Sequence, residues 1–245
     1  MKKLCLLLAS LLATQVASAT VLAVPTRGAH SATERQVREV SPFTAVAAAG
    51  SMRVVLRQGS PQRVEVEAST ADQGRVETEV KNGSLRIGRR REGRKMWDVE
   101  KFDGPVTVYV TAPTLTAVSV SGSGDLRVDG PVQAEDLLVS VSGSGSLTLP
   151  QLTARSLTTT VTGSGDATLG GSSPRHSISV SGSGEVRAAD LRTDDTTVRV
   201  SGSGNARVNA AKTLAARTSG SGSVLVSGNP QITSSKSGSG TVERL

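Results

Sequence analysis

Residues 137–149 read LLVSVSGSGSLTL, and the tetrapeptide Ser-Gly-Ser-Gly inside this stretch decides the fold. The motif recurs along the second half of the chain, once with threonine in first place, at intervals of 18 to 21 residues. The copies begin at Ser121, Ser142, Thr162, Ser181, Ser201, Ser219 and Ser237. A repeat of this length indicates one structural unit stacked on copies of itself.

Apolar and polar residues alternate on both sides of the motif. Leu137, Val139 and Val141 precede the second copy, and Leu147 and Leu149 follow it. This period of two predicts strands with one buried face. Continued through the motif, the alternation points both glycines inward, where they permit a bend and a close backbone approach. The expected structural glycines are Gly122, Gly124, Gly143, Gly145, Gly163, Gly165, Gly182, Gly184, Gly202, Gly204, Gly220, Gly222, Gly238 and Gly240.

The repeats predict an all-β fold, a right-handed parallel β-helix (solenoid) with coils of about 20 residues. Adjacent coils should lie about 4.8 Å apart, so that equivalent serines form ladders whose hydroxyls hydrogen-bond along the axis. The residue before the motif is valine in the first five copies and then Thr218 and Lys236. We therefore expect the last one or two coils to be a polar cap.

The first part of the chain alternates less regularly. Runs with a period of two cover residues 64–68, 76–80, 85–87 and 106–110, and Asn82-Gly83 predicts a tight turn between two of them. Residues 41–245 are expected to form a single domain, with the first strands in 41–115 and the repeats in 116–245. Residues 20–40 lack an apolar period and predict a flexible leader.

Residues 1–19 have the pattern of a secretory signal peptide. Lys2 and Lys3 precede an apolar run, which ends before the small-residue cleavage site Ala17-Ser18-Ala19. The alternative is a buried N-terminal helix. Cleavage would remove two lysines, no acidic residue and the only cysteine, and would lower the net charge from +7 to +5. We expect export by the Sec route to the periplasm, cell surface or extracellular space.

Export and composition together limit the partners. No later stretch approaches about 18 consecutive apolar residues, so no transmembrane segment is expected. Nucleic acid is not an expected partner of an exported protein. The sequence ends nine residues into its last repeat, and we expect no C-terminal membrane anchor. A surface protein is a further possible partner, and oligomerisation stays open.

The order of elements between residues 39 and 245 resembles the head GIN domain family of auto-transporter adhesins. The resemblance rests on Phe43-Thr44, the stretch Arg53–Leu56, the Asn82-Gly83 turn, Pro113-Thr114-Leu115 and the first Ser-Gly-Ser-Gly-Asp. It implies a secreted β-helical domain of the bacterial envelope with no assigned catalytic residues.

No residue pattern in the chain predicts catalysis, a metal or a cofactor. Of the histidines, His30 falls in the leader and His176 at a strand end, and no Gly-x-Ser-x-Gly elbow occurs. The residue after the motif varies from Asp125 to Ser146, which disfavours a calcium ladder. Asp190, Asp194 and Asp195 form an acidic cluster that could serve a polysaccharide-acting enzyme; a solvated loop is the simpler interpretation.

The densest charge is a basic run before Trp97. Its cations are Arg89, Arg90, Arg91, Arg94 and Lys95. This run and Trp97 could bind an anionic envelope glycan or lipid head groups, and the alternative is a solvated hairpin loop. We expect a non-enzymatic binding or adhesion module, which should present a flat polar or basic face. The alternatives are a polysaccharide-acting β-helix enzyme, with carboxylates and bases on one face, and a periplasmic structural or anionic-surface-binding protein.

Overall fold

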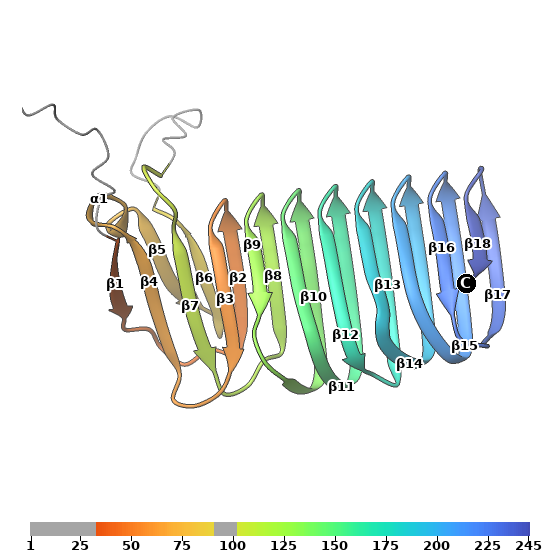
Figure 1. Ribbon diagram of the computed structural model, residues 1–245, viewed down its shortest axis with the longest axis horizontal. Helices are drawn as coiled ribbons and strands as arrows, with labels where there is room; N and C mark the ends of the chain where they lie inside the picture. Colours follow the sequence, from red (N-terminus) through yellow and green to blue (C-terminus); the bar gives the residue numbers. More distant parts are fainter. Residues whose placement is uncertain (1–32, 91–101) are drawn as a thin grey trace, which may run out of the picture. The chain divides into compact units, whose positions relative to one another are not determined.

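The repeats stack as the coils of a β-solenoid in the computed structural model of this chain, which describes residues 33–90 and 102–245 (Figure 1). This confirms the all-β solenoid; its handedness stays a prediction. The strands are β1 Thr33–Arg38, β2 Ala45–Gly50, β3 Arg53–Gln58, β4 Arg63–Ser69, β5 Val76–Lys81, β6 Ser84–Arg89, β7 Thr107–Ala112, β8 Ala117–Gly122, β9 Asp125–Val128, β10 Val132–Gly143, β11 Ser146–Gly163, β12 Asp166–Ser172, β13 Arg175–Gly182, β14 Glu185–Gly202, β15 Asn205–Gly220, β16 Ser223–Ser227, β17 Gln231–Ser237 and β18 Thr241–Arg244.

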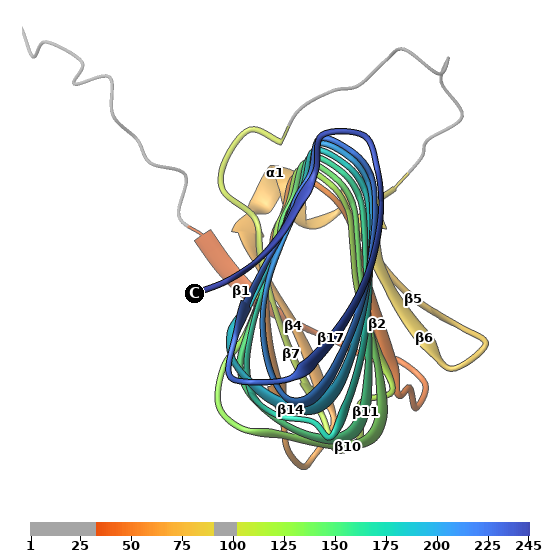
Figure 2. The ribbon, with the colours of Figure 1, turned by 90° about the vertical axis from the view of Figure 1, so that its right-hand side faces the viewer.

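Parallel pairing between coils produces two long sheets that face each other across a flattened tube (Figure 2). The first sheet runs in the order β6, β2, β8, β10, β11, β13, β14, β15 and β17. The second sheet runs in the order β7, β3, β9, β11, β12, β14, β15, β16 and β18. The long strands β11, β14 and β15 continue round the loop edge and belong to both sheets.

Each coil passes from the first sheet to the second at the Ser-Gly-Ser-Gly bend, and the aligned bends form the upper edge in Figures 1 and 2. The first glycine of each motif has φ between +98° and +114°, a conformation that favours glycine. Backbone hydrogen bonds then join successive bends, as from Ser144 N to Gly122 O (2.8 Å) and from Ser164 N to Gly143 O (2.9 Å).

The second glycine of the motif is buried, and it stacks against the carbonyl of its counterpart one coil earlier. A Cβ at Gly165 would lie 2.5 Å from Gly145 O and 2.6 Å from a Val141 methyl. The first glycine of the motif is more exposed than the inward alternation predicts. The position requires glycine because of its positive φ and because the backbone of the preceding coil lies close to it. A bend of the same kind occurs at Gly50 (φ +99°), outside the tetrapeptide repeats.

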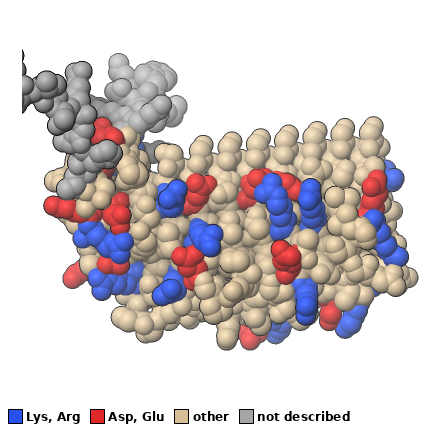
Figure 3. Space-filling model, viewed as in Figure 1, with Lys and Arg blue, Asp and Glu red and all other residues tan. Residues whose placement is uncertain are grey.

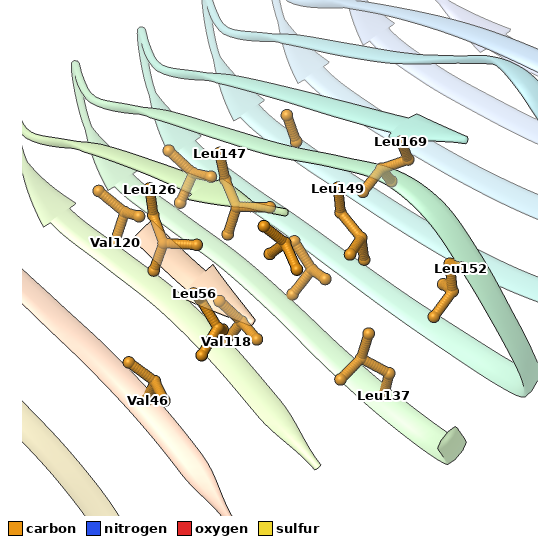
Figure 4. Close-up of a cluster of buried hydrophobic side chains, with 14 of the residues drawn as sticks. Val46, Leu56, Val118, Val120, Leu126, Leu137, Leu147, Leu149, Leu152 and Leu169 are labelled. Atoms are coloured by element: carbon orange, nitrogen blue, oxygen red, sulfur yellow. The ribbon is translucent and has the colours of Figure 1, made fainter. Parts of the chain in front are cut away.

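The core fills the tube with stacked aliphatic side chains. Val118, Val139 and Ile178 are inward residues of the first sheet, and Leu126 and Leu147 lie in register on the second. Figure 4 shows such residues from several coils meeting in one continuous apolar cluster. The second half of the chain therefore builds its core without aromatic residues.

The first end of the stack is covered by antiparallel strands and a single helical turn. β5 pairs with β6, β4 pairs with β7, and β1 pairs with β4; the turn α1 (Thr70–Gln73) follows β4. The expected Asn82-Gly83 turn is confirmed, with φ of 51° and 72° at the two residues. The aliphatic positions expected in residues 64–68, 85–87 and 106–110 are buried, as predicted.

Strand β1 lies within the segment expected to be a flexible leader. Residues 33–38 are mostly exposed, which explains why they show no apolar period. Antiparallel pairing with β4 orders them, together with an ion pair between Arg35 and Glu67 (2.6 Å) and the Arg35 guanidinium 4.1 Å from the Tyr109 ring centre. Residues 33–38 therefore pair with the domain that was expected to begin at residue 41, and the expected division of the chain stays a prediction. The expected signal peptide lies outside the described residues.

The last coil is polar, in agreement with the change from valine to Thr218 and Lys236 in the sequence. β17 is exposed at nearly every residue, with Ile232 partly buried. The serines that begin the motifs are aligned between coils, but among the described residues no hydrogen bond joins one of these hydroxyls to the next. The backbone bonds, and not a hydroxyl ladder, hold neighbouring bends together.

Candidate binding surface

The basic run begins on described residues and continues beyond them. Arg89 ends β6, with its guanidinium 5.6 Å from the Phe102 ring centre, and the Arg90 backbone N–H donates to Arg75 O at 2.8 Å. Arg91, Arg94, Lys95 and Trp97 lie outside the described residues. The binding role of the run stays a prediction.

Asp72 anchors the chain where it re-enters the described part of the fold. Its buried carboxylate accepts hydrogen bonds from Asp103 N (3.0 Å), Gly104 N (3.0 Å) and the Ser69 hydroxyl (2.9 Å), and Arg75 lies 3.2 Å away. Burial alone would raise the pKa of Asp72, but these donors and the Arg75 charge outweigh it and lower the pKa below its ordinary value. The ionised carboxylate therefore fastens Asp103 and Gly104 to α1.

The three expected carboxylates do not form a catalytic pair with one another. Asp194 accepts from Lys212 Nζ at 3.0 Å, and Asp195 accepts from the Thr213 hydroxyl at 2.6 Å. Asp190 is exposed, opposite Gly170 in the preceding coil. Asp194 borders a shallow hollow of about 450 Å³ with Arg192 and Asn209. The arrangement has the character of a solvated, ion-paired loop edge.

His176 lies inside the tube, where it fills the column of Leu157 and Leu214. Its Nε2 is 2.9 Å from the Thr159 hydroxyl, its Nδ1 has no partner, and burial lowers its pKa to about 3. The imidazole is therefore buried, neutral at pH 7 and in contact with the buried Thr159 hydroxyl, not with an exposed serine. Among the described residues, no group of three or more potential metal ligands comes together.

The outward face of the second sheet is charged, and many of its charges are paired. Arg187 contacts Asp166 (3.2 Å) and Glu185 (2.6 Å), and Arg207 contacts Glu185 at 3.2 Å. Figure 3 shows this face of the described residues, with acidic and basic side chains side by side over its length. Exposed pairs of this kind add little stability and leave no large area of one charge.

The part of the outward face of the first sheet that lies beside the bends, which we term the hydroxyl face, differs sharply. Three rows of outward residues run along the stack, and nearly all are alanine, serine or threonine. The rows are Ala45, Ala117, Leu138, Thr158, Ser177, Thr197, Ala215 and Thr233; Ala47, Ser119, Ser140, Thr160, Ser179, Arg199, Arg217 and Ser235; and Ala49, Ser121, Ser142, Thr162, Ser181, Ser201, Ser219 and Ser237. These described positions contain no carboxylate, and their only charges are Arg199 and Arg217; at the first end of the stack, Arg86 on β6 lies in register with Ala47. The next outward row, nearer the loop edge, contains Asp136, Arg175 and Asp195.

A groove follows the stack near the last coils of the hydroxyl face. Arg199, Arg217 and Ser201 are among the residues that line it, and its volume is about 400 Å³. The sequence reasoning missed both arginines. Aligning the repeats could have found them, because the residue two places before the motif is serine or threonine in the other copies.

The comparisons with known proteins agree with this architecture. The sequence profile of the family described as "Putative auto-transporter adhesin, head GIN domain" matches residues 42–230. No curated protein matches the sequence. Among the described residues, no helix is long and apolar enough to span a bilayer.

Solved structures from two bacterial genera share the fold. A "putative adhesin" from Bacteroides fragilis has a TM-score of 0.78 at 22% identity, over 87% of this chain and 97% of that one. A "putative lipid binding protein" and a "putative adhesin", both from Parabacteroides distasonis, each have a TM-score of 0.71, at 22% and 23% identity, and each comparison covers 88% of this chain and 98% of the other. At these identities the likeness concerns the fold alone.

Proposed function

The chain belongs to the head GIN domain family, and from that premise we propose that it is an exported, non-enzymatic binding module of the bacterial envelope. The observation that carries the proposal is the hydroxyl face. It is long, flat and free of carboxylates over the described positions, as a binding module requires. Side chains as short as serine and alanine leave the regular backbone accessible to an extended partner.

The chemistry of this face suits a polar partner. Each serine or threonine hydroxyl can donate one hydrogen bond and accept others. Aligned rows repeat this capacity about every 4.8 Å along the stack. Among the described residues these hydroxyls do not bond to one another, although the Ser119 hydroxyl donates to Val46 O at 3.4 Å.

The acidic loop supports an enzymatic role less well. A general acid and base need carboxylates held in distinct environments with room for substrate. Asp194 and Asp195 are instead engaged by Lys212 and Thr213. We therefore rank the polysaccharide-acting enzyme below the binding module.

Surface exposure is the first test. Intact cells that make the protein are treated with protease, and the protein is followed by immunodetection beside a periplasmic control protein. An adhesion module should be digested in intact cells while the control survives. Protection until the outer membrane is opened would contradict adhesion at the cell surface and place any binding role in the periplasm.

A further inference from the structure

Arg199 and Arg217 form an unusual pair on the hydroxyl face. They are in direct register on β14 and β15, so their backbones lie about 4.8 Å apart. Both are exposed, and within the described residues neither guanidinium has a hydrogen bond or an ion pair. Like charges directly opposite each other on a sheet are unfavourable, so this pair does not serve the fold.

The second sheet of the same two coils provides the contrast. Arg187 and Arg207 are also in direct register on β14 and β15, but Glu185 lies between them and contacts both. Glu185 thus supplies a counter-ion to this arginine pair, whereas Arg199 and Arg217 have none among the described residues. The missing negative charge at Arg199 and Arg217 indicates an anionic ligand.

The groove indicates the shape of the ligand that it could bind. It runs along the stack, with the arginines on one side and the motif serines, including Ser201 and Ser219, on the other. An arginine fork matches a carboxylate with two parallel hydrogen bonds, and serine hydroxyls can bond to the hydroxyls of a sugar. A shallow, open groove along parallel coils accommodates an extended chain.

We propose that Arg199 and Arg217 bind the carboxylates of an acidic polysaccharide that lies along this groove, an inference that rests on the binding function proposed above. A lipid surface fits less well, because insertion into a bilayer needs exposed apolar side chains. The large exposed hydrophobic residues of the described chain are Val37, Leu138 and Leu245, and none of them lines the groove.

The test uses the purified full chain with polygalacturonate as the probe and neutral dextran as its control. The variant Arg199→Gln/Arg217→Gln removes the pair, and Arg187→Gln/Arg207→Gln removes the same charge from the same coils on the opposite sheet. The first variant should weaken polygalacturonate binding about tenfold or more, and the second by less than about threefold. Wild-type binding should fall with added salt, because screening weakens exposed charges. Thermal unfolding of each variant verifies that it is folded.

Several outcomes would overturn the inference. Equal weakening by both variants would indicate attraction by overall charge, without a site. Unchanged binding by the Arg199→Gln/Arg217→Gln variant would place the site elsewhere. Binding to phosphatidylglycerol vesicles but not to polygalacturonate would assign the face to a membrane. Failure to bind any probe would also overturn this inference, whereas the proposed envelope function stands or falls separately on protease exposure in cells.

Discussion

At the scale of single residues, the second glycine of each motif is fixed by the backbone beneath it. Gly165→Ala would place a methyl group 2.5 Å from Gly145 O, a backbone atom that cannot turn aside. We expect the variant to lose about 2 kcal/mol or more of unfolding free energy, measured by denaturant titration. Gly74→Ala is the control, since φ is −71° at Gly74 and no atom outside the adjoining chain lies within 4 Å of an added Cβ. A similar loss in both variants would refute the stacking explanation.

The buried His176 should make the stability of the fold depend on pH. Its pKa is lowered from 6.5 to about 3 in the fold, so between these values the unfolded chain binds a proton that the folded one does not. Stability should therefore fall as pH drops from about 6.5 towards 3, by at most about 1.4 kcal/mol per pH unit from this group. His176→Leu, which matches Leu157 and Leu214 in the same column, should flatten this part of the profile. An unaltered slope would show that other groups cause it.

At the scale of elements, the helical turn α1 binds Asp103 and Gly104, where the described chain resumes after the basic run. Asp72→Asn keeps the size of the side chain but replaces an acceptor oxygen with a donor and removes the charge facing Arg75. We expect a loss of about 2–4 kcal/mol of unfolding free energy, together with faster proteolysis near Asp103 and Gly104. Asp103→Asn, which alters the exposed partner of the same Arg75, should change stability by less than about 1 kcal/mol.

The elements also show what the sequence could predict. The repeats were recognisable because burial of one face imposes a period of two and stacking imposes a period near 20. Strand β1 could not be predicted in this way. An exposed edge strand needs no buried face and so shows no apolar period, and its partner β4 is about 30 residues away in sequence. The pairing of Arg199 with Arg217 could not be predicted for another reason. Their lack of a counter-ion becomes apparent only when the coils are stacked in register.

At the scale of the whole molecule, each coil contacts mainly its neighbours, so stability should be close to a sum over coils and the interfaces between them. Deleting residues 123–143 removes the 21-residue interval between two equivalent motif positions and joins Gly122 to Ser144. Because inward and outward residues keep their register, we expect a shorter protein that still unfolds cooperatively, with a β-type circular dichroism spectrum. Deleting residues 123–133 alone should instead prevent folding. This deletion removes strand β9 from the second sheet but leaves most of β10 in the first, so the coil can no longer pass through both sheets. If the full-coil deletion also fails to fold, then the stack depends on contacts beyond nearest neighbours, and the modular account of the solenoid is wrong.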